Sequence, residues 1–399
     1  MSKLQELIQR LCPDGVEYKK LGEICIFKRG DVLSSKDAVE GDVPVMAGGQ
    51  KPSCYHNVPN RKGETIVVAG SGAYAGFVTY WNIPVFVSDA FSVHPIDGLL
   101  PKYVFHYLKN NQAKIYATKK GAGVPHVHGK DIAKFLIPVP PLEVQEEIVR
   151  ILDRFDVYAA ELQAELQARK EQYEYYRNLL LTFNPAGCAG EADDEQEGSV
   201  TTRGGHSYPI QWKTMGEIGK IKMCKRVMKN QTTDRGDIPF YKIGTFGKKA
   251  DAFISRKIFD EYKRLYSYPR KGTILVSASG TIGRCVVYEG EEAYYQDSNI
   301  VWLDNDESIV LNTYLYHYYQ IVNWNTEGGT IKRLYNDRFA STPIPVPPLE
   351  LQEKIVAVLD RFETLVNDLS EGLPAEIAAV KEQYEYYRNR LLTFKEKTA

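Results

Sequence analysis

Two stretches of the chain place apolar side chains at alternating steps of three and four residues. The first runs from Leu142 to Phe183 and the second from Leu351 to Phe394. This spacing is typical of an α-helix that buries one narrow apolar stripe against another helix. Prolines precede each stretch, and residues 372–374 (Gly-Leu-Pro) predict a break in the second. We expect two long helices paired in antiparallel orientation, the first about 60 Å long if continuous.

The other segments alternate short runs of β-forming residues with turn residues. Thr65-Ile-Val-Val-Ala and Thr273-Ile-Leu-Val-Ser are each followed by a Gly/Ser turn. Tyr103-Val-Phe-His-Tyr and Tyr314-Leu-Tyr-His-Tyr predict one short helix in each segment, and residues 4–11 predict another near the N-terminus. This pattern indicates two strand-rich α/β domains, so the predicted fold class is α+β.

The helical segments occur twice, almost verbatim. Ile137-Pro-Val-Pro-Pro-Leu-Glu returns 207 residues later at Ile344, and Glu171-Gln-Tyr-Glu-Tyr-Tyr-Arg-Asn returns 211 residues later at Glu382. The register therefore slips by four residues within the helical stretch. A period of this length indicates a duplicated domain rather than a solenoid.

The strand-rich segments share a framework but differ in the residues that fill it. They open alike, with Glu17-Tyr-Lys-Lys-Leu-Gly-Glu-Ile and Gln211-Trp-Lys-Thr-Met-Gly-Glu-Ile, and Ser88-Asp89 aligns with Gln296-Asp297. We infer a pseudo-two-fold internal repeat. The predicted boundaries are 1–136 for the first strand-rich domain with its short N-terminal helix, 137–183 for the first helix, 184–208 for an acidic flexible linker, 209–343 for the second strand-rich domain and 344–399 for the second helix.

Charge is segregated along the chain, although the formal net charge is only −1. Residues 13–136 carry 15 basic and 11 acidic side chains and residues 209–343 carry 20 and 15, whereas both helical segments are net acidic. A modest basic excess suits weak phosphate binding but is also common in enzymes. The six cysteines form no CxxC pair, and no signal peptide or membrane-spanning run is present. We therefore expect a cytoplasmic protein with reduced thiols and no membrane partner.

Motifs for catalysis are incomplete. Asp14 and Glu17 imitate a nuclease pattern, but they are only three residues apart and the second copy lacks them. Residues 70–76 have GxGxxxG spacing rather than the dinucleotide pattern, and neither a Walker motif nor an Asn-Pro-Pro-Tyr tetrad for amino-group methylation is present. His126 and His128 lack a third metal ligand. We predict no catalytic residue and no metal site in this chain.

Features for binding are stronger. Two Gly/Ser turns, at residues 70–76 and 279–284, offer backbone amides and hydroxyls that suit phosphates, although each could equally be a tight hairpin. Basic and aromatic side chains that could contact phosphates and base edges cluster near both turns. The candidate DNA-binding residues are Lys51, Ser71, Tyr74, His126, His128 and Lys130 in the first domain, and Lys248, Lys249, Ser279, Thr281, Arg284, Lys332, Arg333 and Tyr335 in the second.

The chain resembles the specificity subunits of type I restriction–modification systems over nearly its whole length. The resemblance rests on the duplicated Pro-Val-Pro-Pro-Leu and Gln-Tyr-Glu-Tyr-Tyr-Arg-Asn blocks and on the two similar openings. The tandem Ala-Glu-Leu-Gln at residues 160–167 is similar to the four-residue tandem of the type IC group. The long acidic segment at 184–207 departs from the family pattern.

The resemblance implies a DNA-binding subunit without chemistry of its own. Two target-recognition domains would each read half of a bipartite, asymmetric site in double-stranded DNA, and the antiparallel coiled-coil helices would set the spacer. Two modification subunits would dock on the chain, bind S-adenosylmethionine and methylate adenine N6. Restriction subunits would add translocation and cleavage that use ATP and Mg. The specificity chain itself would hold no cofactor.

Eight apolar or aromatic residues on the helices are candidates for partner docking or for the spacer. They are Phe155, Leu162, Leu166, Tyr173, Tyr176, Phe362, Tyr384 and Tyr387. A different class of function stays open, namely a helical protein–protein scaffold with two β-rich partner-binding domains and no DNA readout. A self-contained methyltransferase would need a cofactor-binding pattern, which the sequence does not show.

Deleting one Ala-Glu-Leu-Gln unit from residues 160–167 tests whether the helix acts as a spacer. Four residues add about 6 Å to a helix, close to the rise of two base pairs at about 3.4 Å each. The spacer between the half-sites should shorten by about one or two base pairs, while both half-sites keep their sequences. Sequencing of methylated DNA after co-expression with the modification subunit measures this. An unchanged spacer would contradict the prediction.

Overall fold

The computed structural model describes residues 3–34, 36, 39–121, 123–183, 198–201, 207–327 and 332–397. The chain divides into two compact units. Unit 1 comprises residues 1–165 and 375–399, and unit 2 comprises residues 166–374. Both units combine helices with sheets in the same order of strands. The predicted α+β class and the internal repeat are therefore confirmed.

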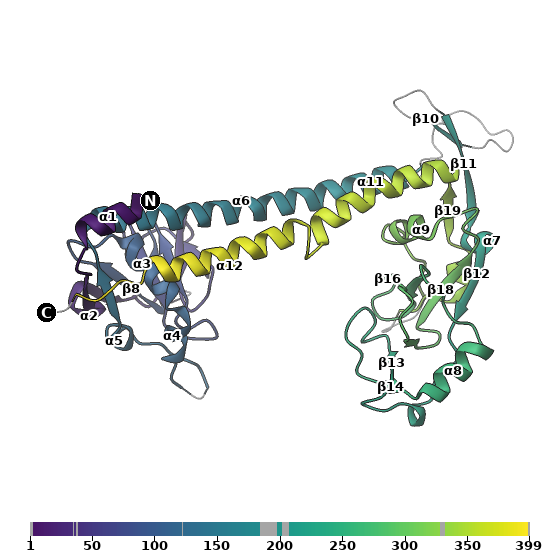
Figure 1. Ribbon diagram of the computed structural model, residues 1–399, viewed down its shortest axis with the longest axis horizontal. Coiled ribbons are helices and arrows are strands. Elements are labelled where there is room, and N and C mark those ends of the chain that lie inside the picture. Colours follow the sequence, from purple (N-terminus) through teal and green to yellow (C-terminus); the bar gives the residue numbers. More distant parts are fainter. Residues whose placement is uncertain are drawn as a thin grey trace. The chain divides into compact units, whose positions relative to one another are not determined.

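The described residues of unit 1 form three sheets. Its strands are β1 (Glu17–Lys20), β2 (Cys25–Arg29), β3 (Val43–Met46), β4 (Cys54–His56), β5 (Thr65–Ala69), β6 (Val78–Trp81), β7 (Phe86–Val87), β8 (Ala90–Pro95) and β9 (Leu136–Val139). Its shorter helices are α1 (Lys3–Leu11), α2 (Leu21–Ile24), α3 (Pro101–Asn110), α4 (Gln112–Ala117) and α5 (Gly129–Ile132). The sheets have the orders β2-β8-β5-β6, β4-β3-β7 and β1-β9 (Figure 1).

Unit 2 repeats this plan. Its strands are β10 (Gly198–Thr201), β11 (Ser207–Thr214), β12 (Gly219–Met223), β13 (Ile238–Tyr241), β14 (Phe253–Ile254), β15 (Ile274–Ser277), β16 (Cys285–Val287), β17 (Tyr294–Tyr295), β18 (Ile300–Asn305) and β19 (Pro343–Val346). Its helices are α7 (Met215–Ile218), the 3₁₀ turn η1 (Lys229–Gln231), α8 (Arg256–Leu265), α9 (Asn312–Tyr319), α10 (Asn336–Ala340) and α11 (Leu349–Asn367). The sheets have the orders β12-β18-β15-β16, β14-β13-β17 and β10-β11-β19, so only β10 lacks a counterpart among the described strands of unit 1.

The helical part of the first repeated block is one uninterrupted helix, α6 (Leu142–Leu181). The second block forms two helices, α11 and α12 (Leu373–Leu391), so the predicted break is confirmed. A side chain at Gly372 would approach the carbonyl oxygen of Thr364 to 2.5 Å, so only glycine fits where the chain turns. None of the described helices combines the length and apolar content needed to cross a bilayer.

Part of the expected linker is a strand. Residues 198–201 form β10, whose backbone pairs with β11, so the predicted linker of 184–208 is too long at its C-terminal end. Residues 184–197 and 202–206 lie outside the described residues. Both repeated blocks, predicted as helices over 137–183 and 344–399, begin with a strand instead, because β9 pairs with β1 and β19 pairs with β11.

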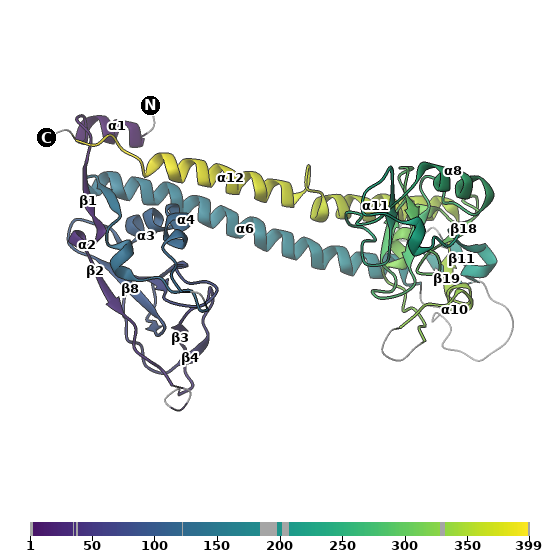
Figure 2. The same ribbon diagram turned by 90° about the horizontal axis from the view of Figure 1, so that it is seen from below.

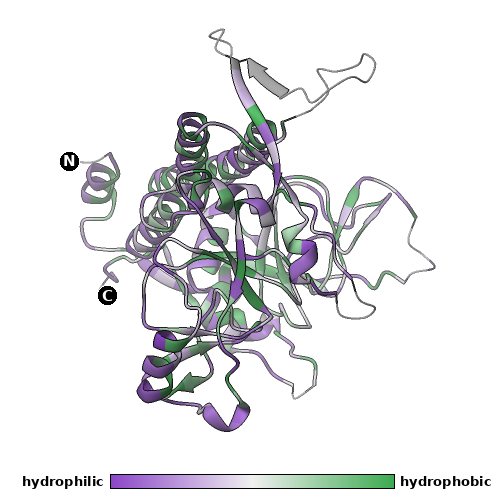
Figure 3. Ribbon diagram, turned by 90° about the vertical axis from the view of Figure 1, so that its right-hand side faces the viewer, coloured by the Kyte–Doolittle hydropathy of each residue, from purple (hydrophilic) through white to green (hydrophobic). Residues whose placement is uncertain are grey.

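The core of each unit is built on its central strands. All five residues of β5 and all four of β15 are buried. Runs of this kind, apolar on both faces, fit strands that are covered on both sides. Figure 3 shows hydrophobic residues gathered on the central strands, whereas many turns are hydrophilic.

The two repeated motifs of each half pair with one another. The opening motif forms β1 and the proline motif forms β9, with Tyr18 opposite Pro138; in unit 2 Trp212 lies opposite Pro345. The buried carbonyl oxygen of this proline needs a hydrogen-bond donor, and in each unit a tyrosine hydroxyl from a helix is that donor. The Tyr103 hydroxyl donates to the carbonyl oxygen of Pro138 at 3.0 Å. The Tyr314 hydroxyl donates to that of Pro345 at 3.1 Å.

One buried glutamine at the start of the long helix completes this network. Gln145 is fully buried, and its Oε1 accepts from the Leu100 amide at 3.0 Å. Its Nε2 donates to the carbonyl oxygens of Gly98 at 3.0 Å and Pro140 at 2.7 Å. In unit 2 Gln352 makes the same three bonds, to Leu311, Ile309 and Pro347. The repeated Pro-Leu-Glu-x-Gln motif thus anchors a helix to the end of a strand.

Aromatic side chains join the long helices within each unit. In unit 1 Phe155 of α6 packs against Tyr384 and Tyr387 of α12, with ring centroids 5.9 and 5.7 Å apart. The Tyr158 hydroxyl donates to Glu376 at 2.6 Å. A residue further along α6 therefore contacts a residue nearer the start of α12, so these helices are antiparallel. They run side by side in both views (Figure 1, Figure 2).

Each unit is completed by the repeated Tyr-rich block of the other half of the sequence. In unit 1 the buried His106 contacts Asp153 at 3.1 Å and Tyr384 at 3.4 Å. Burial lowers the pKa of His106, which favours the neutral ring at this position. In unit 2 His317 contacts Asp360 at 2.7 Å and Tyr173 at 3.4 Å.

Each of these histidines also lies near a second carboxylate, which makes a group of ligand types that metals use. The groups are His106, Asp153 and Asp156 in unit 1 and His317, Asp360 and Glu363 in unit 2. Hydrogen bonds to aspartate and tyrosine already use both nitrogens of each ring. The hydrogen bonds therefore account for both histidine–carboxylate groups as contacts that hold the helices together.

Replacing the buried glutamine tests the anchor. Gln145→Ala should lower the free energy of unfolding by at least about 2 kcal/mol, because one amide and two carbonyl groups lose their partners away from water. Gln163→Ala, on the exposed face of α6, should change it by less than about 0.5 kcal/mol. Urea denaturation of both variants measures the difference. Equal effects would contradict the prediction.

Candidate nucleic-acid interface

Four segments of unit 1 meet at one end of its main sheet. The turn after β5 lies against the start of β8, where the Gly70 amide donates to the carbonyl oxygen of Asp89 at 3.0 Å. The Val127 amide donates to the carbonyl oxygen of Gly70 at 2.9 Å. A side chain at Gly48 would approach the carbonyl oxygen of Ser71 to 2.5 Å, so the loop after β3 also lies against this turn. We define interface 1 as residues 47–53, 70–76, 88–90 and 125–130.

The same four segments meet in unit 2. The Ala278 amide donates to the carbonyl oxygen of Asn299 at 2.7 Å, and the Leu334 amide donates to that of Ala278 at 2.9 Å. Arg284 donates to the carbonyl oxygen of Phe246 at 3.0 Å, which holds the loop after β13 against the hairpin turn. We define interface 2 as residues 242–250, 278–284, 297–299 and 332–336.

The strand register corrects one sequence alignment. Val68 lies opposite Phe91, and its counterpart Val276 lies opposite Val301. The next pairs are Ala69 with Ala90 and Ser277 with Ile300. The residues that precede Ala90 and Ile300 are Asp89 and Asn299, so Asp89 corresponds to Asn299 rather than to Asp297. Two extra residues therefore precede β18, and Ser298 there adopts a left-handed backbone with φ of 51°. Ser88 and Gln296 do correspond, because their amides donate to the carbonyl oxygens of the equivalent residues Met46 and Tyr241. The match of Asp89 with Asp297 was wrong because an insertion of this size leaves no sequence signal.

All fourteen residues predicted to bind DNA lie in these two interfaces, and the Gly/Ser turns are hairpins that connect β5 to β6 and β15 to β16. No described contact tests their binding to DNA, so their roles stay predictions. The exposed ones are Lys51, Tyr74, His126, His128, Lys130, Lys248, Lys249, Thr281, Lys332 and Tyr335; Arg284 and Arg333 are partly buried, and Ser71 and Ser279 are buried.

The two serines hold the strand ends in place. The Ser71 hydroxyl donates to Oδ2 of Asp89. The Ser279 hydroxyl donates to Oδ1 of Asn299 at 2.9 Å, and Arg333 donates to the same oxygen at 2.9 Å. These hydroxyls position neighbouring side chains.

A hollow in interface 1 gathers nitrogen-rich side chains. Arg29, His126, His128 and Lys130 line it. The two imidazole rings are parallel, with centroids 6.4 Å apart and an interplanar angle of 6°. Cationic and imidazole groups of this kind can donate to phosphates or to base edges. The sequence did not single out Arg29, whose only signal is its place at the end of a strand.

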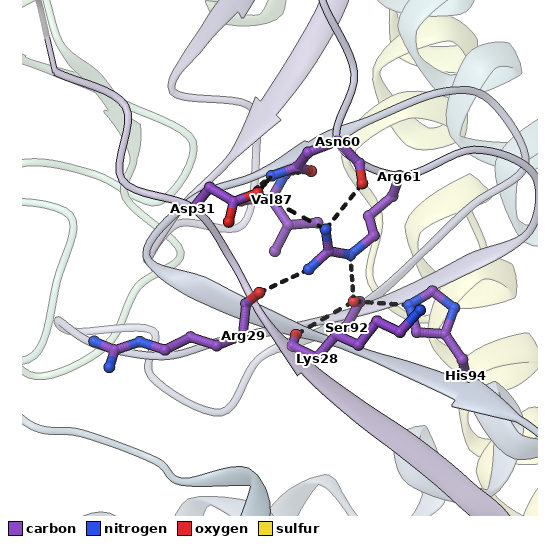
Figure 4. Close-up of polar contacts among 8 residues, drawn as sticks. All are labelled: Lys28, Arg29, Asp31, Asn60, Arg61, Val87, Ser92 and His94. Atoms are coloured by element: carbon purple, nitrogen blue, oxygen red, sulfur yellow. Dashed lines mark hydrogen bonds and ion pairs between the residues drawn. The ribbon is translucent and has the colours of Figure 1, made fainter.

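A polar clasp fixes the strand that carries Arg29, as Figure 4 shows. The largely buried Arg61 guanidinium donates to the carbonyl oxygen of Arg29 at 2.7 Å and to the Ser92 hydroxyl at 2.8 Å. The side chain of Asn60 accepts from the Val87 amide at 2.7 Å and donates to its carbonyl oxygen at 2.8 Å. Adjacent residues thus fasten the ends of β2 and β7 beside interface 1. The clasp joins segments that are distant in sequence, so no local motif predicts it.

Interface 2 is more basic than interface 1. It carries Lys242, Lys248, Lys249, Arg284, Lys332 and Arg333, against the single acid Asp297. Asp297 is paired with Arg226 at 2.8 Å, and Lys242 with Asp251 at 2.9 Å. Interface 1 carries Lys51, Lys130 and two histidines against Asp89. The two interfaces therefore share a backbone frame but differ in charge.

The residues predicted for docking lie mostly in the packing of the helices. Leu162 and Tyr173 are only 5% exposed, and Phe362 stacks on Tyr173 and Tyr176 with centroids 6.4 and 5.6 Å apart. Leu166 packs against the same core, and Phe155, Tyr384 and Tyr387 form the seam of unit 1 described above. The neighbouring tyrosines of the repeated block point outward instead: Tyr175 is 62% exposed and Tyr386 is 58% exposed.

Comparisons with known proteins agree with this geometry. The sequence matches the family "Type I restriction modification DNA specificity domain" over residues 13–171 and 209–379. It is 42% identical over 403 residues to a putative type I restriction enzyme specificity subunit of Haemophilus influenzae, covering 95% of this chain and 96% of that protein. It is 32% identical over 275 residues to the EcoR124I/EcoR124II specificity subunit of Escherichia coli, covering 64% and 61% respectively.

The fold is similar to that of a solved structure. The crystal structure of the type I restriction–modification S subunit from M. genitalium has a TM-score of 0.57 at 16% identity, with 95% of this chain and 96% of that chain covered. At this identity the likeness supports the fold, and the sequence matches carry the family.

Removing lysines from interface 2 tests whether it contacts phosphates. Replacing Lys248, Lys249 and Lys332 with alanine should weaken binding to specific and random duplexes alike and reduce the slope of log affinity against log salt by up to about 0.9 for each contact. Lys220→Ala, at the opposite end of the same sheet, is the matched control and should leave the slope unchanged. Fluorescence anisotropy over a salt series measures both. A triple variant with the wild-type slope would rule out interface 2 as the phosphate-binding surface.

Proposed function

Because this chain belongs to the type I restriction–modification specificity subunits, whose role is sequence-specific DNA recognition, we propose that each unit reads one half of a bipartite DNA site. The specificity subunit is a non-catalytic member of its system. The family assignment disfavours the alternative of a protein–protein scaffold without DNA readout.

One observation carries the proposal for two half-sites: the interface is present twice, in one backbone frame, with different side chains. The serine is the same in both units, at Ser71 and Ser279. At three other equivalent positions the residues differ: Asp89 corresponds to Asn299, His126 to Arg333 and His128 to Tyr335. Side chains with different hydrogen-bond donors and acceptors, placed on the same backbone frame, favour different base sequences. The recognised site would therefore be asymmetric.

DNA and the methyltransferase and restriction subunits are the partners of a specificity subunit of this type. We propose that two modification subunits bind, one for each unit, because the outward surface of the helices is repeated. Tyr175 and Tyr386 occupy equivalent positions, and each packs edge-on against the next tyrosine, with centroids 5.4 and 5.3 Å apart. Exposed, pre-positioned tyrosines are frequent anchors of protein interfaces.

The chemistry would belong to those partners. We propose that the modification subunits bind S-adenosylmethionine and methylate adenine N6, and that the restriction subunits use ATP and Mg. The chain described here would contribute DNA sequence readout and spacing, and the complex would act in the cytoplasm. These assignments rest on the family membership of the chain.

Co-expression with the cognate modification subunit tests the proposed function. Sequencing of methylated DNA should give one bipartite, asymmetric motif, and anisotropy titrations of the purified complex should show at least about a thousandfold preference for a duplex with that motif over a random one. Native mass spectrometry of the complex should show two modification subunits for each specificity subunit. Equal affinity for all duplexes would contradict DNA recognition, and a single bound modification subunit would contradict the stoichiometry.

A further inference from the structure

Asp89 and Asn299 occupy the same point of the repeated frame. Each residue directly precedes an inner strand of its sheet, β8 or β18, and its carbonyl oxygen accepts from the turn residue Gly70 or Ala278. Each side chain accepts from the serine that follows this turn residue. The two side chains therefore leave the backbone at equivalent places and are held by equivalent hydroxyls.

The outward atoms of these two side chains have opposite hydrogen-bonding character. The Ser71 hydroxyl donates to Oδ2 of Asp89, and no described residue donates a hydrogen bond to Oδ1, so a carboxylate acceptor remains. Asn299 turns its Oδ1 toward Ser279 and Arg333. A guanidinium can only donate, which fixes the amide with oxygen inward and the two N–H donors of Nδ2 outward. Among the described residues nothing accepts from that nitrogen.

Base edges in the major groove differ in this same property. The exocyclic amino groups of cytosine and adenine donate, whereas guanine O6 and N7, thymine O4 and adenine N7 accept. A carboxylate reads amino groups and excludes the acceptors by repulsion, and an amide nitrogen does the reverse.

We propose that residues 89 and 299 are equivalent specificity-determining positions, where Asp89 accepts from the amino group of a cytosine or adenine in one half-site and Asn299 donates to a base acceptor in the other. The proposal rests on the proposed function, in which each unit reads one half-site. The exposed His126 and His128 line the same hollow as Asp89.

The exchange of the two residue types tests the proposal in the complex with the modification subunit. Asp89→Asn should alter the preferred base pair at one position of one half-site, and Asn299→Asp should do so at one position of the other. Each substitution should change the discrimination at that position about tenfold or more, while the spacer and the remaining positions are kept. Methylated-DNA sequencing and anisotropy with duplexes that differ by single base pairs measure both.

Controls separate readout from charge and from folding. Asp97→Asn, beyond the other end of β8, removes the same charge and should raise affinity for all duplexes equally without changing the motif. Both test substitutions are isosteric and keep the serine bond, and wild-type unfolding curves would exclude a folding defect. If one variant fails to fold, the other variant still tests the proposal.

The outcomes distinguish this proposal from the function on which it rests. A wild-type complex without sequence preference would overturn the proposed function. A wild-type complex that reads a bipartite motif, together with variants that read the same motif with the same discrimination, would overturn only the role of residues 89 and 299. Changes from both variants in the same half-site would also overturn it.

Discussion

Buried backbone groups at the start of each long helix must find hydrogen-bond partners away from water, and Gln145 and Gln352 meet that constraint. Each glutamine ties the proline motif to the segment that follows β8 or β18, an inner strand of the main sheet. Because Asp89 and Asn299 precede the same strands, helix anchor and recognition surface lie at opposite ends of one rigid element. The fixed length of β8 and β18 thus relates the interface of each unit to its helices.

The sequence predicted much of the fold because the relevant signals are local or repeated. The apolar stripe from Leu142 onward, the break at residues 372–374 and the strand at Thr65 all depend on neighbours along the chain. The exchange of blocks between halves could not be predicted in the same way. Tyr384 belongs to the second repeat in sequence but contacts His106 of unit 1, and nothing in its neighbourhood specifies that distant partner.

The structure brings the predicted DNA-binding residues together in two places, but the sequence did not predict their individual contacts. The fourteen chosen residues fall in the two interfaces because exposed basic and aromatic residues near Gly/Ser turns mark a surface. Their individual roles depend on register and on contacts across the fold. The buried Ser71 and the clasp of Arg61 illustrate this, since both act through partners 18 to 32 residues away. Tyr173, predicted for partner docking or for the spacer, packs inward, where an aromatic side chain is most stabilising.

Much of the frame of both interfaces is held by backbone amides and carbonyls, such as those that link Val127 to Gly70 and Leu334 to Ala278. Bonds of this kind do not depend on the identity of the side chain. Residues that project from the frame can therefore mutate with little loss of stability. A lineage carrying this chain could acquire new target sequences through single substitutions, without first accumulating stabilising changes elsewhere. Recognition can then evolve quickly on a scaffold that itself changes slowly.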